Sequence, residues 1–396
     1  MRRAFLKMIF FLILPVGLYA QEKDTVRAID IQYTSQGFQF TTSDQNYRLQ
    51  IQSRLQFRFA TPGDQNPLTF DDFQAERRTI FKINRARLKI GGHAYRPWLK
   101  YYWEYELSQG NLLDFRVMIE KWTFLKIKAG QWKVDYSRER SISSGKQQMV
   151  DRSIINRPFT LDRQMGIAFY GRINPGGVFD MNYWISILTG TGRGSTDNDD
   201  NNLMYVGRLQ WNIFGIEMPF TNSDLDRSEE PVASLSFATA TNRSQYTRFS
   251  QAGGGSLEGF EEGVPGQFRV NQWMIESAFM YNGFSWAQEF HHKEINDLIN
   301  NTSSTLIGNY FQLGYFLQQI IPWMPRYTEL AIRYAFYNPD INRESITEQE
   351  LGIAINHFFK GHRNKLTAEL THFIFDRNSP NEVDDFRFRI QWEISF

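Results

Sequence analysis

The 396-residue sequence contains no cysteine. This absence excludes disulfide bonds, cysteine-ligated zinc, thiol catalysis and a lipid anchor on a cysteine at a processing site. Beyond its first 20 residues the chain also lacks any run of 18 apolar residues, so the sequence predicts no transmembrane helix. Basic charge is not in excess either. The 44 Lys and Arg stand against 43 Asp and Glu, which gives no indication of a nucleic-acid partner.

The first 20 residues have the layout of a secretory signal peptide. Three basic residues precede the apolar stretch Met8–Leu14, and the small residues Gly17 and Ala20 follow it. We expect cleavage after Ala20. Because three basic residues are lost, the mature chain would hold 41 basic against 43 acidic residues, a net charge of about −2. The apolar stretch is short for an uncleaved membrane anchor, which is the less favoured alternative.

What the sequence does contain is alternation of apolar and polar side chains. Between Tyr47 and Phe59, apolar residues hold nearly every second position, and Arg, Gln and Ser hold the others. Successive side chains of a strand point to opposite faces, so this stretch predicts one long strand with an apolar and a polar face. Similar stretches predict 16 strands, near 47–59, 84–94, 99–107, 113–120, 125–129, 165–169, 179–187, 203–213, 232–240, 269–280, 284–292, 305–317, 327–337, 348–359, 365–375 and 385–396.

The connections between these strands fall into two classes. Short turns rich in Pro, Gly and Asn lie at 95–97, 174–177, 281–283 and 360–362, while longer polar loops lie near 60–79, 133–163, 190–202, 241–267, 293–304, 338–347 and 376–384. Outer-membrane barrels show this asymmetry between short periplasmic turns and long external loops. Two inner connections, 214–231 and 318–326, are longer than such turns usually are.

The fold class we predict is therefore all-β: a transmembrane antiparallel β-barrel of about 16 strands. Many apolar faces run nine or more residues, the length that a tilted strand needs to cross a bilayer, whereas strands of soluble sandwiches are typically shorter. The last strand is apolar at every second position and ends on Phe396, which resembles the C-terminal strand of outer-membrane barrels. We expect a signal peptide over 1–20, a periplasmic lead-in over 21–36 and the barrel over 37–396.

Several short motifs between residues 83 and 172 resemble the phosphate-selective porin O and P family in its Bacteroidetes-type form. They are Arg85-Ala86-Arg87, Ala129-Gly130-Gln131-Trp132-Lys133-Val134, Ser137-Arg138-Glu139-Arg140, Val150-Asp151-Arg152-Ser153 and Asp162-Arg163-Gln164-Met165-Gly166. The resemblance implies a 16-stranded barrel, commonly trimeric, whose third external loop folds into the lumen. In this chain that loop would be about 133–163.

Basic residues outnumber acidic ones, ten to four, on the polar faces of the first five strands. Such a wall concentrates anions, and rings of Arg and Lys are how anion pores select. A generic polar lumen, in which basic and acidic residues pair across strands for structural reasons, remains the alternative. The candidate pore-lining residues are Arg48, Arg54, Arg58, Arg85, Arg87, Lys89, Lys126 and Lys128, and the candidates in the constriction loop are Arg138, Arg140, Arg152 and Arg157.

The sequence predicts no catalytic residue, cofactor or metal site. The cluster His291–Glu294 lacks a partner at metal-ligand spacing, and Asp197–Asp200 lacks the final Glu of a regular calcium loop. We expect an outer-membrane porin for passive diffusion of small hydrophilic solutes, with a preference for anions such as phosphate as a hypothesis. Its partners would be outer-membrane lipid and lipopolysaccharide. Assembly of three copies into a homotrimer is a further hypothesis. The alternative is a non-transport barrel, with a plugged lumen, that acts as a structural or assembly partner of other envelope proteins.

Overall fold

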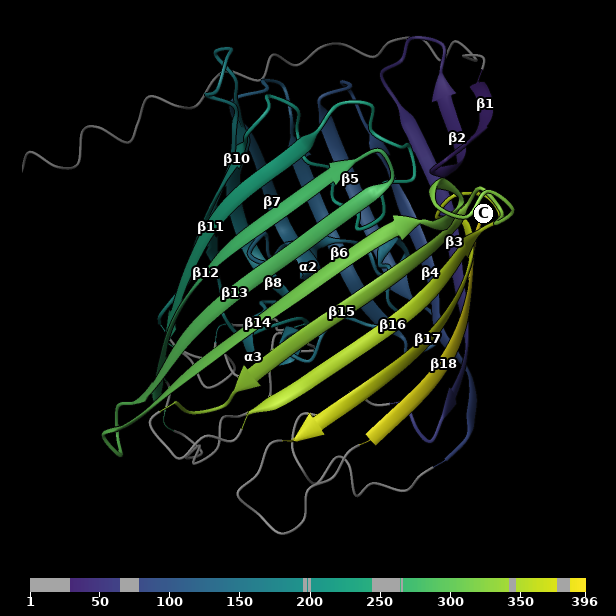
Figure 1. The fold of residues 1–396 in the computed structure, drawn as a ribbon. Coiled ribbons are helices and arrows are strands. Elements are labelled where there is room, and N and C mark those ends of the chain that lie inside the picture. Colours follow the sequence, from purple (N-terminus) through teal and green to yellow (C-terminus); the bar gives the residue numbers. More distant parts are fainter. Residues whose placement is uncertain are drawn as a thin grey trace, which may run out of the picture.

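The computed structural model describes residues 29–64, 78–194, 198, 201–243, 264, 266–341, 347–375 and 385–396. The predicted signal peptide and most of the acidic stretch Asp197–Asp200 lie outside the described residues. Within them, sixteen strands form a closed antiparallel barrel (Figure 1), because each strand pairs with its sequence neighbours and the last pairs with the first. This confirms the predicted fold class, and each of the sixteen predicted strands has a counterpart in the barrel.

The barrel strands are β3 (Arg48–Thr61), β4 (Ile80–His93), β5 (Leu99–Glu106), β6 (Asn111–Ile119), β7 (Lys126–Lys133), β8 (Arg163–Ile173), β9 (Met181–Leu188), β10 (Met204–Asn212), β11 (Val232–Arg243), β12 (Phe268–Tyr281), β13 (Phe284–Asp297), β14 (Thr302–Phe316), β15 (Thr328–Asn338), β16 (Glu348–Phe358), β17 (Asn364–Phe375) and β18 (Asp385–Ser395). Short helical turns are α2 (Arg138–Ser141), η1 (Ser144–Lys146), α3 (Asn156–Phe159) and η2 (Leu317–Gln319). Among the described residues no helix is long and apolar enough to cross a membrane.

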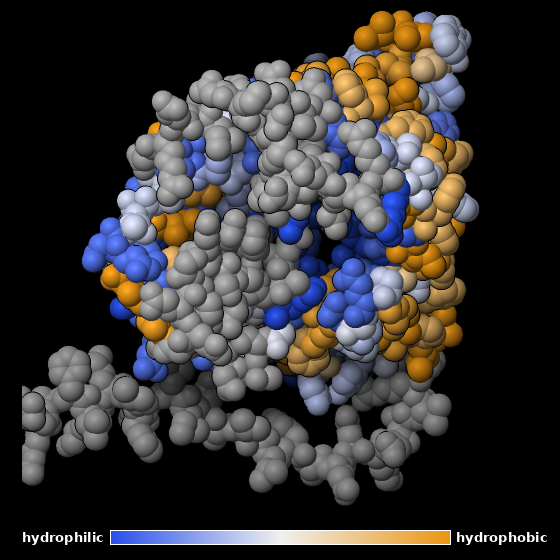
Figure 2. Space-filling view, turned by 90° about the horizontal axis from the view of Figure 1, so that it is seen from below, coloured by the Kyte–Doolittle hydropathy of each residue, from blue (hydrophilic) through white to orange (hydrophobic). Residues whose placement is uncertain are grey.

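Alternation along each strand separates an apolar outer face from a polar inner face. On β18 the outward Phe386 and Trp392 are 55% and 44% exposed, whereas the inward Arg387 and Arg389 are buried. The same division holds around the wall, since most of the large hydrophobic residues on the barrel strands that are exposed belong to the outward set. Figure 2 shows the apolar outer surface together with a hollow lined by hydrophilic residues.

The two ends of the barrel differ. We call the end with connections such as Asn282-Gly283 the turn end, which is uppermost in Figure 1, and the opposite end the loop end, from which Figure 2 is viewed. The loop that we predicted over 293–304 is too long. Strands β13 and β14 pair as far as Asp297 and Thr302, which leaves a connection of residues 298–301. The sequence hides this extension because residues such as Lys293 and Glu294 break the apolar pattern while the strand continues.

A hairpin of β1 (Ile29–Thr34) and β2 (Gly37–Thr42) stands at the turn end, outside the barrel proper. Strand β2 also pairs with the start of β3, so the hairpin extends the wall rather than hanging free. Gly37 has φ +89°, and a Cβ there would lie 2.2 Å from the Ile51 carbonyl oxygen, so the hairpin turn needs glycine at this position. The two six-residue strands fall within and directly after the segment that the sequence analysis left as a lead-in.

Candidate solute path

The segment between β7 and β8, residues 134–162, lies inside the barrel, and we call it the inner loop. In Figure 1 its helical turns α2 and α3 lie within the ring of strands. Its side chains Tyr136, Ile142 and Ile155 are fully buried. The inner loop packs on an inward wall surface that offers small residues. A Cβ at Gly308 of β14, for example, would lie 2.6 Å from the ring of Phe159. The lumen is therefore filled on the β11–β16 side.

Carboxylates of this wall bind backbone N–H groups of the inner loop. Glu289 accepts a hydrogen bond from the Glu139 N–H at 2.6 Å. Glu369 and Glu350 accept from the N–H groups of Val150 at 2.6 Å and of Ile154 at 2.8 Å. All three glutamates are buried. Because a buried carboxylate needs a donor, these contacts fix the loop and satisfy the wall at the same time.

Cations of the same wall bind carbonyl oxygens of the inner loop. The contacts pair long Lys and Arg side chains, rooted on four different strands, with backbone acceptors along the loop. They are Arg208 to Tyr136 O at 2.6 Å, Lys365 to Gln147 O at 2.5 Å, Arg333 to Asp151 O at 2.8 Å and Lys293 to Pro158 O at 2.9 Å. Charges of both signs on strands β10–β17 are thus used to hold the loop.

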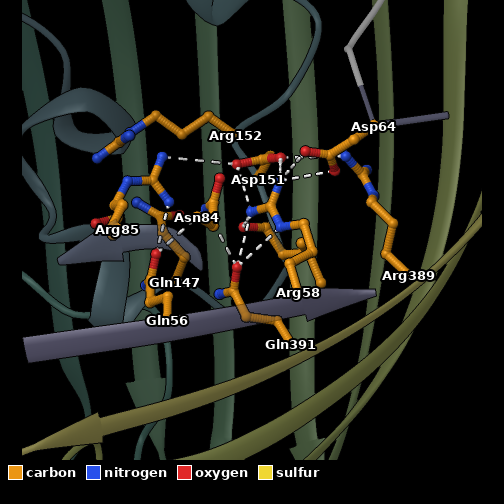
Figure 3. Close-up of polar contacts among 12 residues, drawn as sticks. Gln56, Arg58, Asp64, Asn84, Arg85, Gln147, Asp151, Arg152, Arg389 and Gln391 are labelled. Atoms are coloured by element: carbon orange, nitrogen blue, oxygen red, sulfur yellow. Dashed lines mark hydrogen bonds and ion pairs between the residues drawn. The ribbon is translucent and has the colours of Figure 1, made fainter. Parts of the chain in front are cut away.

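Asp151 is one of the points at which the inner loop meets the first strands (Figure 3). Its carboxylate accepts hydrogen bonds from Arg58 at 2.6 and 3.1 Å and from Arg389 at 3.2 Å, and it lies 3.8 Å from the Arg85 guanidinium. Arg58 also binds Asp64, at 2.9 Å. Arg389 also pairs with Glu369, so three arginines meet three carboxylates in this group.

Four of the predicted pore-lining residues use their charge on protein partners. Arg54 donates to the hydroxyl oxygens of Ser143 and Ser144, at 2.9 and 2.7 Å. Arg87 binds both Glu104 and Glu106, at 2.7 and 2.8 Å. Arg58 is held as described above, and Lys128 forms an ion pair with Asp135. These residues face the lumen, but neighbouring groups already compensate much of their charge.

The other four predicted pore-lining residues are less constrained. Arg85 donates to the Gln56 side-chain oxygen at 2.8 Å, and the Lys126 ammonium lies 5.9 Å from the centre of the Tyr170 ring. Arg48 and Lys89 line a cavity at the turn end. Within the described part of the chain, neither of these two side chains makes a hydrogen bond or an ion pair. Their positive charge is therefore available to a solute.

Three of the four predicted loop arginines hold backbone carbonyl or carboxylate groups. Arg140 forms an ion pair with Asp162, and Arg152 donates to the carbonyl oxygens of Glu139 and Ile142 at 2.8 and 2.7 Å. Arg138 binds carbonyl oxygens of the connection between β10 and β11. The fourth, Arg157, lies on α3. Arg140, Arg152 and Arg138 act as internal braces, although only Nη2 of Arg138 takes part in its two hydrogen bonds.

The cavity at the turn end, which we call the vestibule, has a volume of about 1130 Å³. Segments far apart in the sequence enclose it: the β1–β2 turn, strands β3–β6, the tip of the inner loop and the connections before β11, β15 and β17. Its lining contains seven basic residues and a single carboxylate, that of Asp226. The basic residues are Arg48, Lys89, Lys100, Arg116, Lys146, Lys360 and Arg363.

The sequence did not predict every residue that lines the vestibule. Lys360 lies in the turn 360–362, which the sequence predicts from its glycine, and Arg363 follows that turn. The basic residues of the predicted lumen were counted on strands alone, so these two were missed. His362 lies between them. Burial, with Lys365 and Lys146 nearby, holds the pKa of His362 well below its usual range, so its ring is neutral at pH 7. The positive charge of the lining therefore comes from Lys and Arg.

The sequence matches one protein family, and the fold is similar to several solved barrels. The family model described as phosphate-selective porin O and P matches residues 55–385. The fold is similar to an anion-selective porin from Comamonas acidovorans, with TM-score 0.56 and 11% identity over 88% of this chain and 99% of that one. It is also similar to OmpT of Vibrio cholerae in trimer form, with TM-score 0.53 and 9% identity over 88% and 99% of the two chains.

A third similar structure is the outer membrane channel DcaP of Acinetobacter baumannii, with TM-score 0.54 and 10% identity over 90% of this chain and 99% of that one. At such identities the likeness concerns the fold alone. No curated protein is similar in sequence at a significant level. The family match covers most of the chain and agrees with the barrel and its inner loop. The chain belongs to the phosphate-selective porin O and P family and is an outer-membrane channel for small solutes.

Proposed function

We propose that this channel passes small hydrophilic solutes with a preference for anions. The observation that carries the proposal is the vestibule lining, with seven basic residues and the single carboxylate of Asp226. Two of the seven, Lys100 and Arg116, pair with Glu120 and Asp114, and the other five outnumber Asp226. Clefts lined by one sign of charge raise the local concentration of the opposite ion, and pores lined by Arg and Lys select anions. Two vestibule residues, Arg48 and Lys89, form no side-chain hydrogen bond or ion pair within the described part of the chain, although Glu104 lies opposite Lys89 on the neighbouring strand.

The inner loop explains why wall carboxylates do not cancel this preference. Glu289, Glu350 and Glu369 lie on the far wall, and each is bound by a backbone N–H of the inner loop. The loop therefore covers the wall that carries these carboxylates. The vestibule lies instead along strands β3–β6, where its lining residues are basic or uncharged. Short turns face the periplasm in outer-membrane barrels, so the vestibule would be the periplasmic mouth.

Reversal potentials in a salt gradient test this proposal directly. Purified protein in a planar bilayer, with tenfold more KCl on one side, should give a reversal potential of the sign for chloride over potassium. Lys89→Gln and Arg48→Gln should each shift that potential towards zero, because each removes a positive charge from the vestibule. Lys121→Gln is the matched control, since Lys121 is exposed, does not line the vestibule and lies over the Trp122 ring. A cation-selective wild-type channel would refute the anion preference.

Phosphate itself can be examined in the same recordings. Adding phosphate at constant chloride should reduce the chloride current if phosphate dwells in the vestibule, since Arg and Lys bind phosphate oxygens by charge-assisted hydrogen bonds. The reduction should be smaller for Lys89→Gln than for Lys121→Gln. Equal reductions would leave a preference for anions in general and remove any particular role for phosphate at this site.

Export and assembly form the second part of the proposal. The basic and apolar pattern of residues 1–20 supports cleavage after Ala20, which would leave Gln21 as the first residue. The exposed apolar outer face supports contact with outer-membrane lipid and lipopolysaccharide, and the trimer form of a similar barrel supports a homotrimer. Native mass spectrometry of protein extracted from outer membranes should give a complex of three chains, each lacking residues 1–20. A monomer, or chains of full length, would contradict the corresponding part.

A further inference from the structure

The connection between β10 and β11 is the longest of the turn-end connections that the sequence analysis noted, and it does not simply reverse the chain. Its residues 216–224, which we call the strap, run across the turn end of the lumen, where they contact the inner loop. Met218, Asn222 and Ser223 of the strap are buried, although a periplasmic connection would ordinarily be exposed. Burial of this kind requires contacts, and the strap has them on three sides.

The first part of the strap packs on strands β9–β12. Met218 belongs to an apolar cluster with Val232, Ala278 and Met280. The ring of Phe220 lies edge-on to the ring of Trp184 on β9, with 6.2 Å between ring centres.

The last part of the strap is bound further around the barrel, at β15 and at the connections after β12 and β16. The Ser223 hydroxyl donates to Glu329 of β15 at 2.8 Å. The Thr221 hydroxyl lies 3.0 Å from Nε2 of His362, in the connection between β16 and β17. Asp224 accepts a hydrogen bond from the Gly283 N–H at 2.7 Å. Strands β9 and β15 are well separated around the barrel, so a segment bound to both spans the lumen.

The strap also holds the inner loop at two points. The Arg138 guanidinium donates to the carbonyl oxygens of Pro219 and Thr221, the latter at 3.0 Å, and it lies 5.4 Å from the centre of the Phe220 ring. The Asn222 N–H donates to the Lys146 carbonyl oxygen at 3.3 Å. These contacts grip both ends of the arc from Arg138 to Lys146. Lys146 in turn lines the vestibule.

We propose that the strap is a second constriction element of the channel. It closes the β9–β15 side of the lumen from the turn end and positions the inner-loop arc between Arg138 and Lys146. The strap and the inner loop together then set the width of the path that remains along strands β3–β7. The proposal rests on the channel function of the barrel and does not depend on the anion preference.

Two substitutions loosen the strap in different ways. Phe220→Ala removes the ring that packs between Trp184 and Arg138. Arg138→Lys keeps the positive charge but shortens the side chain, so that the reach of Nη2 to both carbonyl groups and the planar guanidinium over the Phe220 ring are lost. We expect each to raise the single-channel conductance about two-fold or more and to increase current noise, because current follows the open cross-section of a water-filled pore. Phe214→Ala is the matched control, since Phe214 is 55% exposed on the same connection.

The readouts separate this inference from the anion preference. Folding of each variant is checked by the heat-dependent gel mobility of the barrel, and pore size by liposome swelling with sugars of graded mass. Folded Phe220→Ala and Arg138→Lys channels with the conductance and size cut-off of the wild type would overturn the proposal. If Phe220→Ala does not fold, the milder Arg138→Lys decides. A cation-selective wild type would remove the anion preference and leave the role of the strap intact.

Discussion

At the scale of single residues, a lumen-facing charge is informative only together with its partners. Arg87 and Lys89 are two positions apart on β4 and face the same way, and the sequence treats them as equivalent. In the structure Arg87 binds Glu104 and Glu106, whereas Lys89 lines the vestibule without an ion-pair partner among the described residues. Period-two alternation predicts the face of a residue but not its partner: Glu104 stands opposite Lys89 in the register, yet the longer Arg87 side chain reaches it diagonally. The sequence alone therefore predicted the direction of these side chains and not their availability.

Glu350 shows how much one residue can hold. Its Oε1 accepts from Arg333 Nε at 2.7 Å and its Oε2 from the Ile154 N–H at 2.8 Å, and the side chain is fully buried. Glu350→Ala would leave a buried guanidinium without its carboxylate, which typically costs ~3–5 kcal/mol. We expect a lower unfolding midpoint in urea, followed by loss of barrel gel mobility, and noisier channels because the inner loop loses an anchor.

The control for this prediction is Glu294→Ala. Glu294 lies on β13 and is exposed, so its removal should change the midpoint little. Equal midpoints for Glu350→Ala, Glu294→Ala and the wild type would show that the Arg333–Glu350 contact does not stabilise the barrel. A shifted midpoint without added current noise would show that Ile154 stays in place when its acceptor is removed.

At the scale of elements, long strands were predictable and short or irregular segments were not. A strand with lipid on one side and water on the other must alternate over nine or more residues, which leaves a strong period in the sequence. The hairpin of β1 and β2 is outside the barrel proper, and although β1 alternates between apolar and polar residues, it does so over only six residues, fewer than a strand needs to cross a bilayer. The strap was visible only as an unusually long connection, because the contacts that bury it come from the inner loop and from distant strands and turns of the chain.

The position of the inner loop came from the family resemblance and not from the residues themselves, yet the wall held a signal. Small residues occupy inward positions of the strands that face the loop. A Cβ at Gly314 would lie 1.9 Å from the Gln148 side chain, and one at Gly352 would lie 2.6 Å from the Met149 side chain. Glycine in a strand interior often marks a close approach of another segment. Inward glycines on β14 and β16 could therefore have predicted which wall the loop covers.

At the scale of the whole molecule, the strands form a regular closed ring, but protein segments occupy its interior mainly on one side. The inner loop and the strap occupy the side of β9–β17, and the vestibule opens beside β3–β6. Both signs of charge are present on the wall, and the chain is almost neutral overall. Selectivity in such a molecule follows from which wall is left uncovered, since covered charges are compensated by the segments that cover them.

The absence of cysteine makes this asymmetry measurable. Lys89→Cys places a thiol in the vestibule, and Ser236→Cys places one on the inward face of β11. Ser236 is 2% exposed, and its hydroxyl accepts a hydrogen bond from Arg208 and donates one to Glu276. An anionic methanethiosulfonate reagent should react with Lys89→Cys in the open channel, reduce its current and shift its reversal potential towards cation preference, because each labelled thiol adds a negative charge to the path. Ser236→Cys should stay unlabelled until the barrel is denatured. Rapid labelling of Ser236→Cys in the conducting channel would mean that solutes also pass on the side of the inner loop, and the one-sided path would then be wrong even if the channel still prefers anions.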